Sequence, residues 1–138
     1  MHTAPTNCQD EVLAPKLRVL IIEDDADCAD STALLLRTWG FTAEIARDGE
    51  AGLAAAQGQR PDVLLLDIGL PKLNGYDVAK HLNDLIWKKK PFIIAMTGRD
   101  REKDQQRADE AGIHLRLTKP VNPQELLALL QRFERIIN

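Results

Sequence analysis

The sequence predicts an α/β fold in which a five-stranded parallel sheet is covered by helices on both faces. Two observations lead to this prediction. Short apolar runs rich in Val, Leu and Ile recur along the chain, and such runs are typical of strands buried on both faces. They alternate with longer segments whose apolar residues have helical spacing, which favours parallel strands joined by right-handed crossovers. The 138 residues suffice for one domain with its own core.

Five apolar segments are expected to form the strands. The third, from Val63 to Asp67, ends abruptly on a carboxylate that is followed by Gly69 and Pro71. A short run bounded by turn residues in this way is typical of a strand. The five predicted strands cover residues 17–22, 41–46, 63–67, 91–97 and 115–119.

Five helices are expected to alternate with these strands, over residues 26–39, 48–58, 74–87, 101–111 and 122–137. Asp25 and Asp48 are suited to cap the first two, and Gly40 to end the first. The fourth is charged almost throughout, with only Ala108 and Ala111 as apolar contacts, so it should be the least firmly packed.

The third and fifth helices have distinct end signals. The third closes on Lys88, Lys89 and Lys90, a cationic last turn that complements the helix dipole. The fifth begins with Asn122 as its cap and Pro123 at the first helical position. Its expected buried stripe is Leu126, Leu129, Leu130, Phe133 and Ile137.

Residues 1–16 carry two prolines and no periodicity, so they are predicted to form a flexible leader. Residues 17–137 are predicted to form a single flavodoxin-like domain with strand order 2-1-3-4-5. In a doubly wound sheet of this kind, the first and third strands lie side by side at the point where strand order reverses.

Composition limits the classes of partner and compartment. The formal net charge of −3 shows no basic excess, which argues against direct nucleic-acid binding and against a polybasic membrane patch. Proteins are the expected partners. Cys8 and Cys28 lack metal-ligand spacing and suggest a reducing compartment. With no signal peptide and no apolar run of membrane-spanning length, a cytoplasmic location without membrane insertion is expected.

Polar side chains stand at the carboxyl ends of four of the predicted strands, and these ends meet at one edge of a parallel sheet. These residues are Glu23, Asp24, Asp67, Thr97 and Lys119. Three carboxylates and one ammonium would leave the pocket about two charges negative, which favours a bound divalent cation. Oxygen ligands without a nearby His or Cys indicate Mg²⁺, or Mn²⁺, as that cofactor.

With a cation in place, these residues suit a phosphoryl-transfer site. Asp67 can act as a carboxylate nucleophile that forms an acyl phosphate. Lys119 and the cation would neutralise phosphoryl oxygens, the Thr97 hydroxyl would donate to one of them, and Gly98 would leave room. The chain has no Walker-type loop, so a nucleotide is not the expected substrate.

Together these segments resemble the receiver domain of two-component response regulators, in particular receivers associated with hybrid histidine kinases. The resemblance covers about 120 residues, and matches in this order are specific where any one alone is weak. The matching segments are Ile22-Glu23-Asp24-Asp25, Asp67-Ile68-Gly69-Leu70-Pro71 with Gly75, Thr97-Gly98, Leu117-Thr118-Lys119-Pro120-Val121.

The resemblance implies that Asp67 accepts a phosphoryl group from a histidine kinase or a histidine phosphotransfer protein. It implies Mg²⁺ bound by Glu23, Asp24, Asp67 and the backbone carbonyl of Gly69, slow autodephosphorylation, and a cis peptide bond before Pro120. The protein would then not be an enzyme beyond its own phosphorylation and dephosphorylation. A stand-alone receiver of this kind is expected to signal by contact with a downstream protein, as a monomer or a phosphorylation-dependent dimer.

Two positions depart from the family pattern. Gly69 has no side chain to orient a hydrolytic water, and Arg116 replaces the aromatic residue that usually acts as a rotamer switch. Family members use the fourth helix, fifth strand and fifth helix as their signalling surface. Arg116 is therefore expected to be solvated or paired with an acid such as Asp109 or Glu110, and to contribute little.

Two alternatives remain open. One is a Mg²⁺-dependent hydrolase of the aspartyl-phosphate type, which normally needs a second acid two residues after the nucleophile, where this chain has Gly69. The other is a degenerate receiver that serves only as a binding module. A degenerate receiver would be expected to lack the Asp, Thr or Lys, and all three residue types are present here.

Overall fold

The structure is a computed structural model and describes residues 17–70, 74–85, 90–98 and 108–137. Its five strands form one parallel sheet in the order β2-β1-β3-β4-β5, which confirms the predicted fold class. The strands are β1 (Arg18–Ile22), β2 (Thr42–Ala46), β3 (Val63–Asp67), β4 (Phe92–Thr97) and β5 (Leu115–Thr118). The predicted leader, 1–16, and residues 101–107 of the predicted fourth helix lie outside the described residues.

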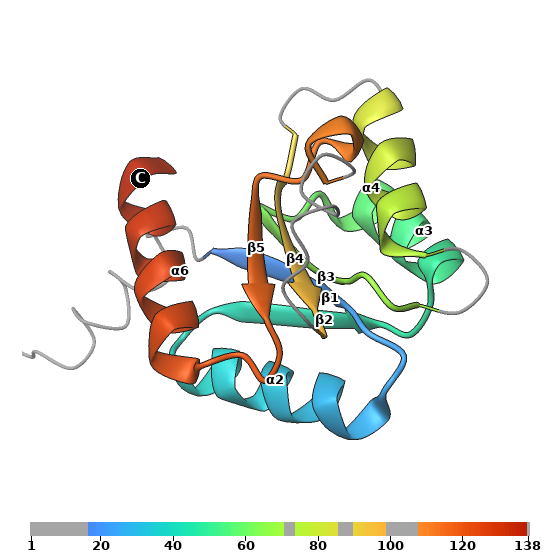
Figure 1. Ribbon diagram of the computed structural model, residues 1–138. Helices are drawn as coiled ribbons and strands as arrows, with labels where there is room; N and C mark the ends of the chain where they lie inside the picture. The colour runs from blue at the N-terminus through green and yellow to red at the C-terminus, as the bar shows by residue number, and fades with distance from the viewer. Residues whose placement is uncertain (1–16, 71–73, 86–89, 99–107, 138) are drawn as a thin grey trace, which may run out of the picture.

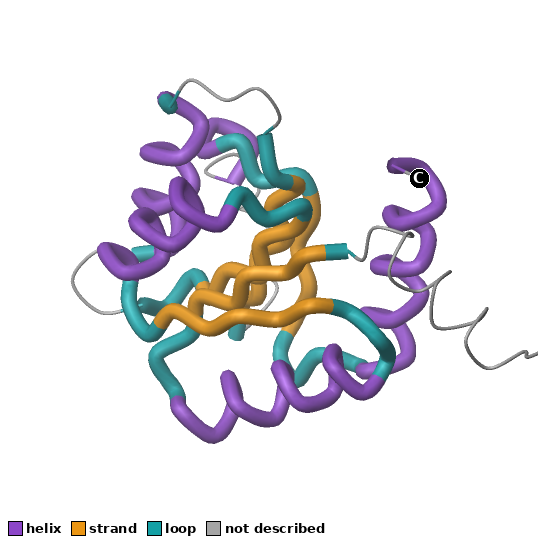
Figure 2. Tube along the Cα trace, turned by 180° about the vertical axis from the view of Figure 1, so that it is seen from behind, coloured by secondary structure: helices purple, strands orange, loops and turns teal. Residues whose placement is uncertain are grey.

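Helices cover both faces of the sheet (Figure 1). They are α2 (Ala26–Thr38), α3 (Gly49–Gln59), α4 (Gly75–Asp84), α6 (Pro123–Ile137) and the helical residues 108–111. Figure 2, seen from behind, shows the same arrangement, with α2 and α6 on one face and α3 and α4 on the other. The strand order therefore places β3 at the centre of the molecule, flanked by β1 and β4.

Two apolar clusters, one on each face, hold the sheet between the helices. In β1, Val19 and Ile21 pack into the cluster with α2 and α6, whereas Leu20 and Ile22 pack into the cluster with α3 and α4. This alternation follows from the two-residue period of a strand. Every residue of β3 is buried, as expected for the central strand of a parallel sheet.

The helix starts agree with the predicted caps, and each cap oxygen accepts a backbone N–H that the helix itself leaves unpaired. These bonds are Cys28 N to Asp25 Oδ1 (3.1 Å), Ala51 N to Asp48 Oδ1 (2.7 Å), Asp77 N to Asn74 Oδ1 (3.0 Å) and Gln124 N to Asn122 Oδ1 (2.8 Å). On α6, Leu126 and Leu130 are buried and Leu129 and Phe133 are half-buried. The Ile137 side chain lies outside the described residues.

Two predicted helix ends were wrong. Helix α4 ends at Asp84 rather than Trp87, because Leu85 is already extended, with φ −79° and ψ 151°. The Lys90 ammonium still donates to the Asn83 carbonyl at 3.3 Å, so a lysine satisfies the last turn from outside the helix. Lys88 and Lys89 lie outside the described residues.

Helix α3 continues past Gly58, its predicted end, to Gln59. The residue in the left-handed region is Arg60, with φ 52°. Pro61 follows it and disfavours the helical conformation at Arg60, so the helix ends there.

Gly75 brings the start of α4 against the end of β3. Its N–H donates to the Ile68 carbonyl at 3.1 Å. A Cβ at this position would lie 2.6 Å from Ile68 Cα and 2.7 Å from the Asp67 carbonyl oxygen, so only glycine permits this approach. Within the described ranges, no helix combines the length and apolar character needed to cross a membrane.

Candidate functional site

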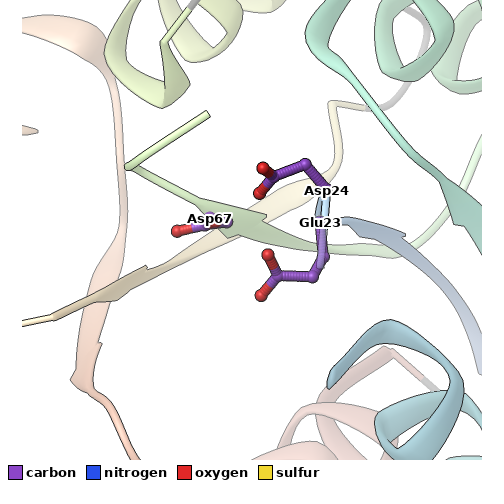
Figure 3. Close-up of side chains that lie close together, drawn as sticks. All are labelled: Glu23, Asp24 and Asp67. Carbon is purple, nitrogen blue, oxygen red and sulfur yellow. The ribbon is translucent and has the colours of Figure 1, made fainter. Parts of the chain in front are cut away.

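Three carboxylates meet at the carboxyl ends of the two central strands. Glu23 and Asp24 directly follow β1, and Asp67 is the last residue of the neighbouring β3. Each offers an oxygen, and these oxygens lie within 4.8 Å of one another. Figure 3 shows the three side chains projecting to the same side of the two strands. The predicted convergence of these acids is therefore present in the fold.

Lys119 reaches this cluster from the edge strand. It follows β5, and its backbone N–H donates to the Thr97 carbonyl at 2.6 Å, which holds it against the end of β4. Its ammonium lies 2.7 Å from Glu23 Oε1 and 3.3 Å from Asp67 Oδ1. The peptide bond between Lys119 and Pro120 is cis, as the family resemblance implied.

Glu23 is the most deeply placed acid of the cluster, with 1% of its surface exposed. Burial alone would raise its pKa, but hydrogen bonds with Asp67 and Lys119 outweigh burial and leave the pKa lowered. Its Oε2 also accepts the Asp25 N–H at 3.3 Å. Glu23 is thus held as a carboxylate by donors on two sides.

The pKa of Asp67 is shifted in the opposite direction to that of Glu23. It is 7% exposed, and burial together with the neighbouring Glu23 raises its pKa, although the Gly69 N–H and Lys119 oppose that shift. Oδ1 accepts the Gly69 N–H at 3.0 Å and also faces the lysine ammonium. Two donors on one oxygen fix the orientation of this carboxylate at the end of the strand.

The donor set fits a hard divalent cation. Three carboxylates face one ammonium, so negative charge is in excess, and after burial the neighbouring Glu23 contributes to the raised pKa of Asp67. Oxygen ligands suit Mg²⁺ and Mn²⁺. Glu23, Asp24 and Asp67 could hold the ion, with Asp24 as the exposed ligand and the other two buried.

The remaining predicted site residues lie around the cluster. Thr97, 8% exposed, ends β4, one residue after Met96, which pairs with Asp67 in register. Gly98 follows it, and a Cβ there would meet no atom of the described residues within 4 Å.

Arg116 is not part of the acid cluster. It pairs with Ala95 on β4, is half-buried, and lines a cavity of about 300 Å³ together with Thr97 and Ala108. The expectation that Arg116 is solvated or paired with an acid such as Asp109 or Glu110 stays a prediction.

Cys28 is a neighbour of the site that the sequence did not reveal. Burial and a hydrogen bond with Glu23 raise the pKa of its thiol. The position could have been suspected because Cys28 is the third residue after the Asp25 cap, and side chains there reach back toward the start of the helix.

Comparison with known proteins identifies the family. The model of the response regulator receiver domain matches residues 19–131. This chain belongs to that family. The fold and the order of strand-end residues therefore agree with the receiver resemblance found in the sequence.

Curated relatives of this receiver include regulators of known name. It is 39% identical over 113 residues to the sensory transduction protein RegX3 of Mycobacterium tuberculosis, covering 82% of this chain and 48% of that protein. It is 34% identical over 111 residues to the DNA-binding response regulator MtrA of Mycobacterium leprae, covering 80% of this chain and 48% of that protein. The receiver thus spans about half the length of these relatives.

Solved structures show the same fold. The chemotaxis response regulator CheY4 of Vibrio cholerae is 30% identical, with a TM-score of 0.79 over 86% of this receiver and 99% of that chain. The N-terminal domain of an uncharacterized protein from Wolinella succinogenes is 32% identical, with a TM-score of 0.79 over 87% and 95% of the two chains.

Proposed function

We propose that this receiver takes part in a phosphorelay and that Asp67 is the residue that is phosphorylated. The observation that supports this role most directly is the position of Asp67 at a strand end, with Lys119 at 3.3 Å and two further carboxylates around it. Membership of the receiver family supports phosphorelay signalling in general.

In the proposed reaction, a carboxylate oxygen of Asp67 attacks the phosphorus of a phosphohistidine. The O–P bond forms, the N–P bond breaks, and the imidazole of the donor leaves with the bonding pair. Lys119 stabilises charge on the transferred oxygens, and Thr97 donates its hydroxyl to one of them. Both residues are positioned by the strand ends next to Asp67.

Glu23, Asp24, Asp67 and the Gly69 carbonyl would hold Mg²⁺ beside the acceptor. When bound, the cation neutralises phosphoryl oxygens. The residues of the site also hold one another in position. Glu23 keeps the ammonium of Lys119 directed at the site, and the Gly69 N–H keeps Asp67 Oδ1 in place.

Dephosphorylation would be slow. Water must attack the phosphorus opposite Asp67, which releases inorganic phosphate and regenerates the carboxylate. Gly69 stands where a side chain could orient that water, and it has none. The lack of a side chain at Gly69 also argues against the hydrolase alternative, which needs an acid at this position.

The proposed partners are a histidine kinase or a histidine phosphotransfer protein as donor, and a downstream protein as target. Readout would pass through β5, α6 and the helical residues 108–111. The cytoplasmic location and a phosphorylation-dependent dimer remain predictions.

Acetyl phosphate with Mg²⁺ tests the phosphorylation site. Intact mass should show one added phosphate that is lost at alkaline pH, and Asp67→Asn should show none. Asp62→Asn is the matched control, because Asp62 stands at the other end of β3, where its Oδ2 accepts the Arg18 N–H. It should label like the wild type.

Two results would contradict the proposal: equal labelling of Asp67→Asn, or labelling that EDTA does not diminish. A hydrolase would instead release phosphate continuously from a small phosphate ester. A pure binding module would show neither labelling nor release.

A further inference from the structure

His114 bonds to Ile93 in a way that a regular strand pair does not. The backbone N–H of His114 donates to the Ile93 carbonyl at 3.0 Å, and the Ile93 N–H donates to the imidazole Nδ1 of His114 at 2.9 Å. In a regular continuation of the β4–β5 register that second acceptor would be the carbonyl of Ile113. The bond from the His114 N–H is shifted by one residue from that register, just after a turn at Gly112 with φ +82°. The imidazole therefore replaces a main-chain acceptor.

This bond lies at a weak point of the sheet. β5 is the edge strand, it has four residues, and its pairing with β4 begins only at Ile94 and Leu115. The Ile93 side of the bond is buried, with 1% of that residue exposed, so its N–H needs a partner inside the protein. The opposite end of β5 is held by Lys119 N and the Thr97 carbonyl.

The direction of the bond makes it sensitive to protonation. Nδ1 can accept a hydrogen bond only while it carries no proton, and protonated imidazole is a donor at both nitrogens. His81 provides the contrast. Its Nδ1 lies 2.7 Å from the Asp77 carbonyl, so there Nδ1 must donate, and protonation leaves that bond intact.

The ring also connects β5 to α6. His114 stacks on Phe92 with 4.7 Å between ring centroids and 16° between planes. Phe92 in turn lies 5.0 Å from Phe133 of α6, at 40°. A change at the imidazole can therefore reach both the edge strand and the last helix.

Charged residues lie on the described elements around the ring, including Asp109 and Glu110 in the helical residues just before it. Partial burial and then the charge of Lys90, just before β4, lower the pKa of His114. On β5 Arg116 lines the same cavity as the imidazole. On α6, Arg132 and the half-buried Glu134 flank Phe133, whose ring contacts Phe92. His114 is exposed, so protons reach it from solvent.

We propose that His114 is a pH-sensitive latch that closes the β4–β5 ladder when neutral and releases it when protonated. Release removes the bond of the Ile93 N–H at the start of β5, while the bond from the His114 N–H and the Lys119 end stay in place. The proposal does not rest on the phosphorylation site, because the bond lies at the opposite end of β5 from Lys119, although Thr97 and His114 line one cavity.

NMR of the full chain tests the latch through the Ile93 amide. On lowering the pH through the His114 titration, the Ile93 amide signal should shift with the same midpoint as the His114 ring. Its hydrogen exchange, corrected for intrinsic rate, should speed up about two- to tenfold, as expected for loss of one hydrogen bond. His81→Asn should behave like the wild type.

Two variants separate the acceptor from the ring. His114→Asn keeps a side-chain acceptor and should hold Ile93 protected across the same pH range. His114→Phe keeps the stacking on Phe92 but lacks the acceptor, so Ile93 should exchange rapidly at every pH. An Ile93 amide unaffected by His114 titration would overturn the latch, as would His114→Asn retaining the wild-type pH response. If His114→Phe fails to fold, the wild-type titration and His114→Asn still decide the matter.

Discussion

Lys119 lies closer to Glu23 than to Asp67, at 2.7 Å against 3.3 Å. The lysine is therefore bonded first to a buried acid that we assign to cation binding, and only second to the proposed phosphoacceptor. Because the proposed cation site and Lys119 share the same carboxylates, a bound cation would influence how the lysine is held.

Removing the lysine should make the fold more dependent on cations. Lys119→Ala leaves Glu23 buried without its ammonium, which should lower stability in EDTA by about 1–2 kcal/mol, a value reduced because the Lys119 side chain is 28% exposed. Mg²⁺ should restore more stability to this variant than to the wild type, since a competing positive charge is gone. Thermal unfolding in EDTA and in Mg²⁺ measures both. Lys80→Ala on α4, an exposed lysine, should show neither effect.

Replacing the proposed phosphoacceptor should stabilise the cation-free protein. Burial and Glu23 raise the pKa of Asp67 above 3.8 in the folded protein. The folded state therefore binds the proton more tightly than the unfolded state does, and protonation of Asp67 stabilises the fold. This stabilisation is lost as the pH rises through the folded pKa. Asp67→Asn should therefore be more stable at pH 7 by roughly 1 kcal/mol, with the gain shrinking as the pH falls toward 3.8.

Urea unfolding in EDTA across that pH range measures this gain. Saturating Mg²⁺ should reverse the order at pH 7, because the wild type binds the ion and gains stability from it. A variant that is less stable than the wild type in EDTA at pH 7 would contradict the electrostatic account.

Replacing two of the helix glycines by alanine should have opposite effects on stability. Gly75→Ala places a Cβ 2.6 Å from Ile68 Cα and should cost about 1–3 kcal/mol while displacing the segment after Asp67. Gly58→Ala, inside α3 with nothing within 4 Å, should stabilise by about 0.5–1 kcal/mol. Chemical denaturation compares them, and equal effects would mean that the close approach of α4 to β3 is not real.

Phosphoryl mimicry should alter a limited part of the chain. With beryllofluoride and Mg²⁺, amide hydrogen exchange should change mainly over residues 98–118, of which 99–107 lie outside the described structure. The proposed cause is that the Thr97 hydroxyl is drawn toward the phosphoryl mimic. Thr97→Ala should therefore abolish the response. Arg116→Ala should preserve most of it. Loss of the response in Arg116→Ala would show that this side chain transmits the signal.

Much of the fold follows from local patterns. The apolar runs predicted β1 and β3, and Asp25, Asp48, Asn74 and Asn122 marked helix starts, because a cap needs only a side chain and the N–H groups two or three residues on. Helix ends were harder. The end of α4 at Asp84 depends on Leu85 leaving the helix, which no end signal within the helix announced.

By itself, the sequence determined which residue types stand at which strand ends, and therefore that acids, a hydroxyl and an ammonium share one edge of a parallel sheet. Tertiary structure alone decided how they are paired. Lys119 and Glu23 are 96 residues apart, and their contact depends on strand register and side-chain rotamers. The same holds for Ile93 and His114, where an imidazole accepts the hydrogen bond that a main-chain carbonyl would accept in a regular ladder. Such pairings arise from distances across the fold, which no local pattern of residues encodes.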